Sequence, residues 1–346
     1  MVLGNPNTIF HYVLIGFYIV CLSGLFLYGT NCYLLLLRFR SHRLQGLREY
    51  RRVLREFAVS RWYTDPPRVT VQLPVYNERY VIGRLLKAVC ALDYPRDRLE
   101  IQVLDDSTDD TVEIVRRLVR GYQEEGLSIA HIRRAGRQGF KAGALRNGME
   151  TARGEFMAIF DADFVPPPDF LRKTIPYFCN PRVGMVQVRW GHMNPDDSLL
   201  TRAQSIGIDG HFSIEQGARA WSGLFLNFNG TAGIWRRQAI LEAGGWQADT
   251  LTEDMDLSYR AQLAGWQLKY MMHVSCPAEL PRQVSAFKSQ QFRWDKGSIQ
   301  PARKLIPAIL KARCSRFAKY QAILHLTHYL IHPLMVATVF LSLPLM

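Results

Sequence analysis

The sequence predicts an α/β protein with a doubly wound, mainly parallel sheet that is attached to a membrane near both ends of the chain. Between residues 62 and 281, short β-branched runs alternate with helical patterns, which is typical of such a sheet. The 346-residue chain has no Asp, Glu, Lys or Arg from Met1 to Leu37 or from Tyr320 to Met346. Each of these segments exceeds the ~20 apolar residues that cross a bilayer as a helix.

The first uncharged segment, residues 1–37, predicts a membrane-spanning helix. A secretory signal peptide is the alternative, but it would carry its basic residues before the apolar part. Here eight arginines follow within residues 38–61 and only Glu49 and Glu56 oppose them, which gives this basic juxtamembrane segment a balance of +6. Because basic loops stay on the cytoplasmic side, we expect the N-terminus outside and the following domain in the cytoplasm.

A second basic segment, residues 282–319, carries ten Lys and Arg against Asp295 alone, a balance of +9. Together the two basic segments account for more than the net charge of +13. We therefore attribute the basic character to helices at a membrane with anionic headgroups, and we expect no nucleic-acid binding. Six cysteines without a Cys-x-x-Cys pair indicate reduced, structural thiols.

The water-soluble domain, residues 62–281, shows strands and helices in alternation. The predicted strands are 69–71, 101–104, 128–132 and 156–160, and the predicted helices are 81–89, 111–119 and 141–150. The first strand is β-branched, and the first helix repeats its apolar residues at helical spacing. Ser, Thr and Asp side chains at 105–110 can cap the helix that follows them.

Acidic residues follow three of the predicted strands. They are Glu78, Asp105, Asp106, Asp161 and Asp163. Ligands of doubly wound sheets bind at the carboxyl ends of the strands, so we expect these acids to converge on the edge of one crevice. The first strand is not followed by G-x-G-x-x-G and the chain has no Walker A loop, which argues against a dinucleotide oxidoreductase and a P-loop NTPase.

Asp161-Ala162-Asp163 predicts a metal site. Two carboxylates at a strand end suit a hard divalent cation that keeps positions open for diphosphate oxygens, and such a cation neutralises a leaving nucleotide diphosphate. Taken alone, the tripeptide is more typical of a turn or a helix cap. Its place between an apolar strand and the rigid run Val165–Pro168 favours the metal site.

Thr252-Glu253-Asp254 forms a second acidic cluster. It is also a common helix start, with Thr252 as the N-cap and acids in the first turn. A carboxylate at the mouth of a helix beside a metal site can reach an acceptor hydroxyl and take its proton. We select Asp254 as the candidate base, with Glu253 as the alternative.

Gln290-Gln291-Phe292-Arg293-Trp294 lies inside the second basic segment. The Arg293 guanidinium can fork onto diphosphate oxygens, and Trp294 offers a flat apolar face for a sugar ring. An interfacial amphipathic helix with snorkelling Lys and Arg side chains is the plainer interpretation. The two interpretations are compatible if the helix lies between the water-soluble domain and the membrane.

These motifs carry a resemblance to a known family. In order and spacing, residues 68–300 resemble membrane family 2 glycosyltransferases, the cellulose synthase superfamily, which carry a D, DxD, TED and Q(Q/R)xRW set of motifs. The segments that match are Pro74–Glu78, Asp105-Asp106, Asp161–Asp163, Thr252–Asp254 and Gln290–Trp294. Within it, Phe228–Arg236, Leu199–Arg202 and Glu253–Leu257 are most similar to the cellulose-synthase-like glucomannan 4-β-mannosyltransferases.

The resemblance implies a GT-A catalytic domain on the cytosolic face and an inverting, single-displacement transfer of a hexose from a UDP- or GDP-sugar to a β-1,4-glycan of glucan or mannan type. Asp161 and Asp163 would place Mg²⁺ or Mn²⁺, and Asp254 would deprotonate the acceptor. The implied donor-binding residues are Tyr76, Glu78, Asp105, Asp106, Lys141, Asp161, Gln290, Gln291 and Arg293. The implied acceptor-binding residues are Trp294, Asn229, Gly230 and Thr231.

Two further expectations concern the acceptor. Family members normally have several spans after the interfacial helix, whereas this chain ends within or just after the first, residues 320–346. We therefore expect a truncated chain or a pore supplied by a partner or an oligomer. The alternatives in function are transfer of a single sugar to a membrane lipid, and a non-catalytic subunit that binds nucleotide sugars.

Overall fold

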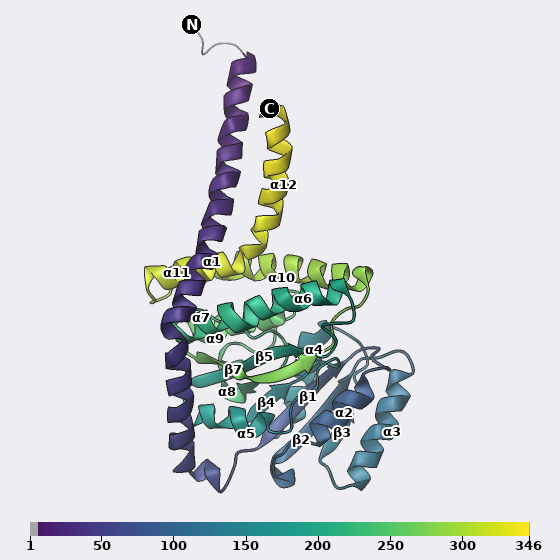
Figure 1. Cartoon of the computed structure of the whole chain (residues 1–346). Coiled ribbons are helices and arrows are strands. Elements are labelled where there is room, and N and C mark those ends of the chain that lie inside the picture. The colour runs from purple at the N-terminus through teal and green to yellow at the C-terminus, as the bar shows by residue number, and fades with distance from the viewer. Residues whose placement is uncertain (1–5, 346) are drawn as a thin grey trace.

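The computed structural model describes residues 6–345, and it contains one seven-stranded sheet (Figure 1). The strand order is β3-β2-β1-β4-β6-β5-β7, with β1 (Val69–Val75), β2 (Leu99–Asp105), β3 (Ile129–Ile132), β4 (Phe156–Ile159), β5 (Val183–His192), β6 (Gly233–Arg236) and β7 (Gln267–Ala278). Only β6 runs against its neighbours β4 and β5. The predicted mainly parallel sheet and its first four strands are confirmed.

Helices cover both faces of the sheet. They are α2 (Ile82–Cys90), α3 (Thr111–Glu124), α4 (Phe140–Thr151), α5 (Phe170–Thr174), α6 (Leu199–Gly210), α7 (Gln216–Trp221), α8 (Arg237–Glu242) and α9 (Glu253–Leu263). Side chains of β4 alternate between two cores: Phe156 and Ala158 pack with α2 and α3, and Met157 and Ile159 pack with α4 and α8. This alternation explains why the strand reads as a continuous apolar run.

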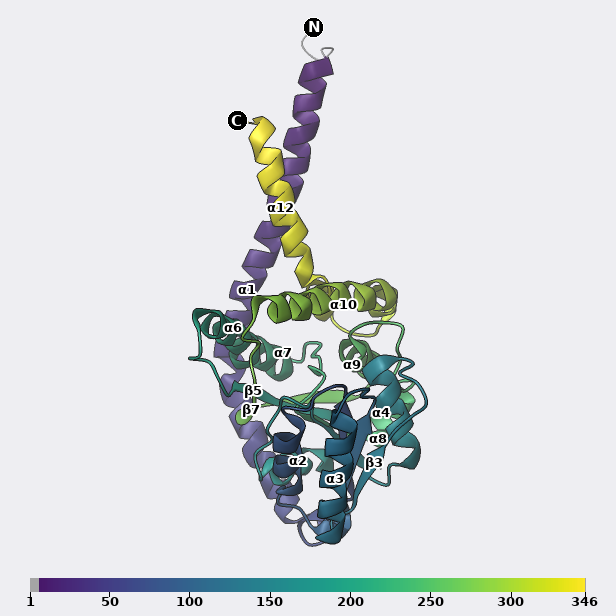
Figure 2. The same ribbon diagram turned by 90° about the vertical axis from the view of Figure 1, so that its right-hand side faces the viewer.

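Within residues 6–345, two helices are long and apolar enough to cross a membrane, over Thr8–Ala58 and His328–Leu345. The upper part of α1 (Pro6–Ala58) and α12 (Ile331–Ser342) project on the same side of the domain (Figures 1 and 2). They touch where a Cβ on Gly24 would meet the Leu334 side chain. Residues 1–5 and 346 of the two predicted spans lie outside the described residues.

The lower half of α1 differs from the expected position at lipid headgroups. It continues as one helix to Ala58 along the side of the domain (Figure 1), where Glu49 pairs with Lys269 at 2.6 Å and Tyr50 contacts His273. A helix rises 1.5 Å per residue, so the arginines at 51–55 lie roughly 20 Å or more past Arg38. These arginines therefore flank the domain that contains the sheet.

α10 (Val284–Lys311) and α11 (Arg316–Leu326) cross the domain between the sheet and the projecting ends of α1 and α12 (Figure 2). The Thr252 hydroxyl donates to the Gly297 carbonyl at 2.6 Å and ties α10 to the start of α9. The predicted span 320–346 is divided, because α11 ends at Leu326 and the span-length apolar stretch begins at His328.

Candidate active site

The carboxyl ends of β1, β2 and β4 lie at one edge of the sheet. Val75, the last residue of β1, is in register with Asp105, the last residue of β2. Asp106 directly follows β2, and the remaining strand-end acids follow within three residues of β1 or four of β4. The structure therefore brings the predicted acids to a common edge, which faces α10 (Figure 2).

Lys141 is the centre of the candidate site. Its Nζ donates to Asp161 Oδ1 at 2.5 Å and to the Gly230 carbonyl at 3.0 Å. A Cβ built on Gly230 would lie 3.0 Å from Asp254 Oδ2 and 3.4 Å from Lys141 Nζ. Three elements far apart in sequence, α4, the end of β4 and α9, thus meet at this glycine.

The site has an excess of negative charge that one lysine does not neutralise. Burial and the charge of Asp161 raise the pKa of Asp163 to about 7. Burial and the charge of Asp254 raise the pKa of Glu253 to about 7, and burial, with a smaller contribution from the charge of Asp161, raises the pKa of Asp254 to about 6. Burial opposes the charge on Lys141, but its pKa is raised because Asp161 and the two α9 acids stabilise the cation.

The carboxylates fit a divalent cation. Asp161 and Asp163 are hard oxygen ligands from one strand end, and a cation would stabilise the ionised form of Asp163, whose pKa is raised by burial and by the charge of Asp161. Residues 6–345 contain no group of three ligating side chains already gathered for a metal. The remaining positions would fall to water and diphosphate oxygens, the arrangement typical of Mg²⁺ with a nucleotide.

The end of β2 is fixed by two basic side chains that our sequence reasoning missed. His131 pairs with Asp105 at 2.7 Å, and Arg134 grips both oxygens of Asp106 at 2.7 and 2.5 Å. Burial would raise the pKa of Asp105, but the hydrogen bonds from His131 and Ser107 lower it. The sequence feature that could have indicated these partners is a histidine, followed by arginines, at the end of the third predicted strand.

Arg134 also connects Asp106, at the end of β2, with the start of α4. It donates to the carbonyls of Gln138 and Phe140, directly before Lys141. The next basic residue, Arg137, lies over the Tyr76 ring at 3.3 Å from its centroid. The predicted nucleotide-binding residues of β1 and β2 are thereby connected to the start of α4.

The predicted acceptor residues and the predicted donor residues of α10 separate into two groups. The Thr231 hydroxyl accepts from the Asp161 amide at 2.9 Å, and the Asn229 amide donates to Gln187 at 3.0 Å. These residues thus adjoin the charged centre. Within residues 6–345 no side-chain hydrogen bond or ion pair fixes Gln290, Gln291, Arg293 or Trp294 on α10, although Gly297 on the next turn touches Thr252. The roles of all these residues stay predictions.

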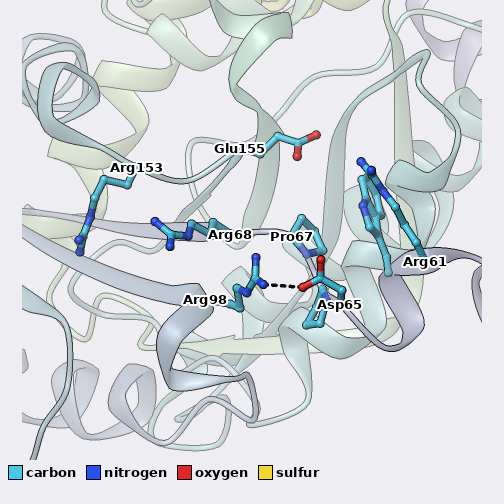
Figure 3. A pocket seen from close by; sticks show the side chains of 9 residues that line it. Arg61, Asp65, Pro67, Arg68, Arg98, Arg153 and Glu155 are labelled. Carbon is cyan, nitrogen blue, oxygen red and sulfur yellow. Dashed lines mark hydrogen bonds and ion pairs between the residues drawn. The ribbon is translucent and has the colours of Figure 1, made fainter.

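A separate cleft of about 330 Å³ lies at the opposite, amino-terminal ends of β1 and β4 (Figure 3). Arginines line it, and Arg98 pairs there with Asp65 at 2.5 Å. Among the described residues, none of the predicted site residues lines this cleft, so it is distinct from the candidate active site.

Comparison with known sequences identifies the domain. The family described as Glycosyltransferase like family 2 matches residues 66–297. The chain belongs to this family. The match covers every strand of the sheet and the charged centre around Lys141, and it confirms the family resemblance that the ordered motifs carry.

Two curated relatives of this glycosyltransferase are glucomannan 4-β-mannosyltransferases. The chain is 46% identical over 260 residues to the Probable glucomannan 4-beta-mannosyltransferase 6 of Oryza sativa subsp. japonica, covering 73% of this chain and 45% of that protein. It is 45% identical over 258 residues to the Glucomannan 4-beta-mannosyltransferase 2 of Arabidopsis thaliana, covering 73% and 48%. The chain thus spans about half the length of these relatives.

Solved structures show the same GT-A-like fold. The mannosyltransferase PcManGT from Pyrobaculum calidifontis, in complex with GDP-Man and Mn²⁺, aligns with a TM-score of 0.63 at 23% identity over 90% of this chain and 85% of that one. TarS 1–349 of S. aureus with UDP-GlcNAc aligns with a TM-score of 0.55 at 16% identity over 76% and 72%. At these identities the likeness establishes the fold of the glycosyltransferase.

Proposed function

We propose that this glycosyltransferase moves a hexose, with mannose as the first candidate, from a GDP- or UDP-sugar to the end of a β-1,4-glycan. The observation that carries the proposal is the meeting of Lys141, Asp161 and Asp254 around Gly230. This arrangement supports a proposal in which Asp254 is the base and Lys141 binds the diphosphate beside it. The mannosyltransferase names of the curated relatives favour mannose.

In the proposed reaction Asp254 takes the proton from an acceptor hydroxyl, the hydroxyl oxygen forms a bond to the anomeric carbon, and the bond from that carbon to the diphosphate breaks. A single displacement of this kind inverts the anomeric centre. Lys141 and Arg293 hold the leaving diphosphate, and Trp294 stacks on the acceptor sugar. A divalent cation on Asp161 and Asp163 would supply Lewis-acid stabilisation of the leaving group.

We further propose that α1 and α12 are membrane spans, with the N-terminus outside and the domain on the cytoplasmic face. Their apolar parts project together beyond α10 and α11 (Figure 1). Lys and Arg along 38–61 and 282–319 favour this orientation. The acceptor side of the site then faces the membrane, an arrangement that also suits the second candidate function, transfer of one sugar to a lipid.

The test uses membranes containing the chain, Mn²⁺ or Mg²⁺, and labelled GDP-mannose, UDP-glucose, UDP-GlcNAc or UDP-galactose. We expect label from GDP-mannose in an ethanol-insoluble product that a β-1,4-mannanase releases. Asp254→Asn membranes are the control and should lose this product while still binding donor. Label in the organic extract would mean that the acceptor is a lipid and not a glycan. A lack of incorporation from every donor would overturn the proposal for this chain.

A further inference from the structure

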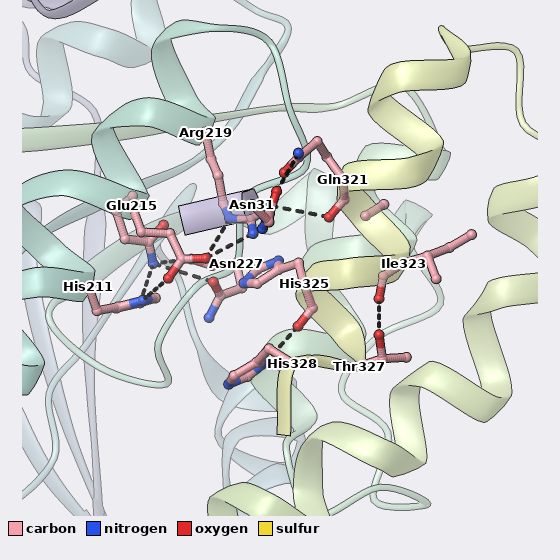
Figure 4. A network of polar contacts seen from close by, with 12 residues as sticks. Asn31, His211, Glu215, Arg219, Asn227, Gln321, Ile323, His325, Thr327 and His328 are labelled. Atoms are coloured by element: carbon pink, nitrogen blue, oxygen red, sulfur yellow. Dashed lines mark hydrogen bonds and ion pairs between the residues drawn. The ribbon is translucent and has the colours of Figure 1, made fainter. Parts of the chain in front are cut away.

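A partly buried polar network lies next to the charged centre, where α6 passes into α7 (Figure 4); the His211 and Glu215 side chains are 27% and 29% exposed. The connection is a π-helical turn, η4 (His211–Glu215). In an α-helix, residues five apart lie on different faces, whereas the i→i+5 bonding of a π-turn places them one turn apart. The turn thereby puts His211 and Gln216 on the same side, and both contact Asn229.

The hydrogen bonds of His211 define its tautomer. Its Nε2 lies 3.0 Å from the Asn229 side-chain nitrogen and 3.1 Å from that of Gln216, and its Nδ1 lies 3.0 Å from Glu215 Oε2. Amide nitrogens only donate and a carboxylate only accepts. With the amides oriented this way, Nε2 is the acceptor and Nδ1 carries the proton that is donated to Glu215.

Glu215 is itself held in place. Its other oxygen, Oε1, receives the Nε and Nη2 groups of Arg219 at 2.9 and 2.8 Å. Burial would raise the pKa of Glu215, but the charge of Arg219 and the His211 hydrogen bond keep it well below its ordinary value. The carboxylate is therefore ionised and can orient the imidazole.

The network is bound to α11 and to the candidate span α1. Arg219, whose side chain is 1% exposed, reaches the Gln321 carbonyl of α11 at 3.4 Å. The Gln321 amide donates to the buried Asn31 of α1 at 2.6 Å. Figure 4 shows these side chains converging from three helices on one another. Packing from three directions leaves little freedom for the Arg219–Glu215 pair.

The other end of the network is the turn that forms the site. Asn229 directly precedes Gly230, whose carbonyl holds Lys141, and Thr231, whose hydroxyl holds the Asp161 amide. A shift of the Asn229 side chain would move this turn relative to both charged groups. We infer that His211, with its tautomer fixed by Glu215, is a positioning residue that sets the Asn229–Thr231 turn for sugar transfer. This inference rests on the proposed function.

Two variants separate this role from simple packing. His211→Gln carries a carbonyl near the position of Nε2 and can still accept from Asn229. His211→Asn keeps an amide near Nδ1 for Glu215 but has no acceptor at the Nε2 position. Both full-length proteins are to be compared with wild type in donor KM, in kcat, in melting temperature and in hydrogen–deuterium exchange of the peptide containing 228–232.

We expect His211→Asn to lose about tenfold in kcat, because two neutral hydrogen bonds together contribute roughly that factor, with donor KM nearly unchanged. His211→Gln should stay within about threefold of wild type, since it restores the acceptor. Exchange of 228–232 should quicken only in His211→Asn. Equal losses in the two variants, or losses that follow the melting temperature, would overturn the inference.

The exchange measurement requires no substrate. If wild-type protein transfers no sugar but His211→Asn alone loosens residues 228–232, the proposed function fails and the positioning of the turn stands. If transfer is robust while exchange and kcat are unchanged in His211→Asn, the proposed function stands and the positioning role is wrong.

Discussion

Gly230→Ala tests the geometry of the candidate active site with a single methyl group. Gly230 has φ of +82° and lies between Lys141 and Asp254. The added Cβ would lie 3.0 Å from Asp254 Oδ2. That carboxylate cannot rotate freely, because its Oδ1 accepts the Met255 amide at 2.8 Å. The methyl group must therefore displace the candidate base.

The structure gives the size of the effect. Ordinary contacts of a Cβ begin at 3.4 Å, so Asp254 must move by about 0.4 Å. A misplacement of 1 Å in an active site costs about 10²-fold in rate, and on that scale 0.4 Å costs roughly sixfold. Left-handed backbone adds roughly 1–2 kcal/mol of strain for alanine, which lowers the melting temperature by a few degrees.

Gly126→Ala is the matched control. Gly126 has φ of +83° and has no heavy atom within 4 Å of its built Cβ, so it brings the same backbone strain without the collision. Initial rates of sugar transfer at saturating donor and melting temperatures are to be measured for both variants. We expect similar losses of stability and a loss of kcat in Gly230→Ala alone. Equal kcat values would refute the placement of Asp254 beside Gly230.

Three further predictions follow from other contacts. Arg134→Ala removes the bidentate partner of a carboxylate that is only 7% exposed, and we expect about 3–5 kcal/mol less stability in urea unfolding, with partial recovery in Arg134→Lys. Because burial raises the pKa of Asp254 to about 6, the base is ionised above that pH. kcat/KM should therefore fall as the pH drops through about 6, and a fall only near 3.8 would contradict the assignment. Gly46→Ala places a methyl group into the Trp221 indole and should loosen α1 in protease digestion, whereas Gly29→Ala, with open space around it, should not.

Local patterns in the sequence predict the sheet and the position of its acids. Each of the first four strands is a short apolar run followed by acids or by a helix, and a parallel sheet places such strand ends on one edge. The prediction for 156–160 matches β4 because both faces of that strand are buried. These inferences need only periodicity and strand direction.

The partners of these acids could not be predicted in the same way. Arg134 grips Asp106 across 28 residues, and Gly230 meets Lys141 across 89, so both contacts depend on how the whole sheet is assembled. The course of α1 is a similar case. Its arginines from residue 38 onward are typical of a segment at lipid headgroups. Apolar side chains of the same helix, such as Val53, nevertheless pack into the domain core, so the helix runs along the domain.

Backbone strain gives independent support for the location of the site. Three non-glycine residues of the described chain have positive φ: Asn77 at 56°, Phe140 at 47° and Ala232 at 53°. Asn77 follows Tyr76 at the end of β1, Phe140 precedes Lys141, and Ala232 follows Thr231. Such conformations cost of order 1–3 kcal/mol each and gather at functional sites. All three flank residues whose roles the family resemblance implies, so the fold maintains strain where the proposed chemistry needs exact backbone placement.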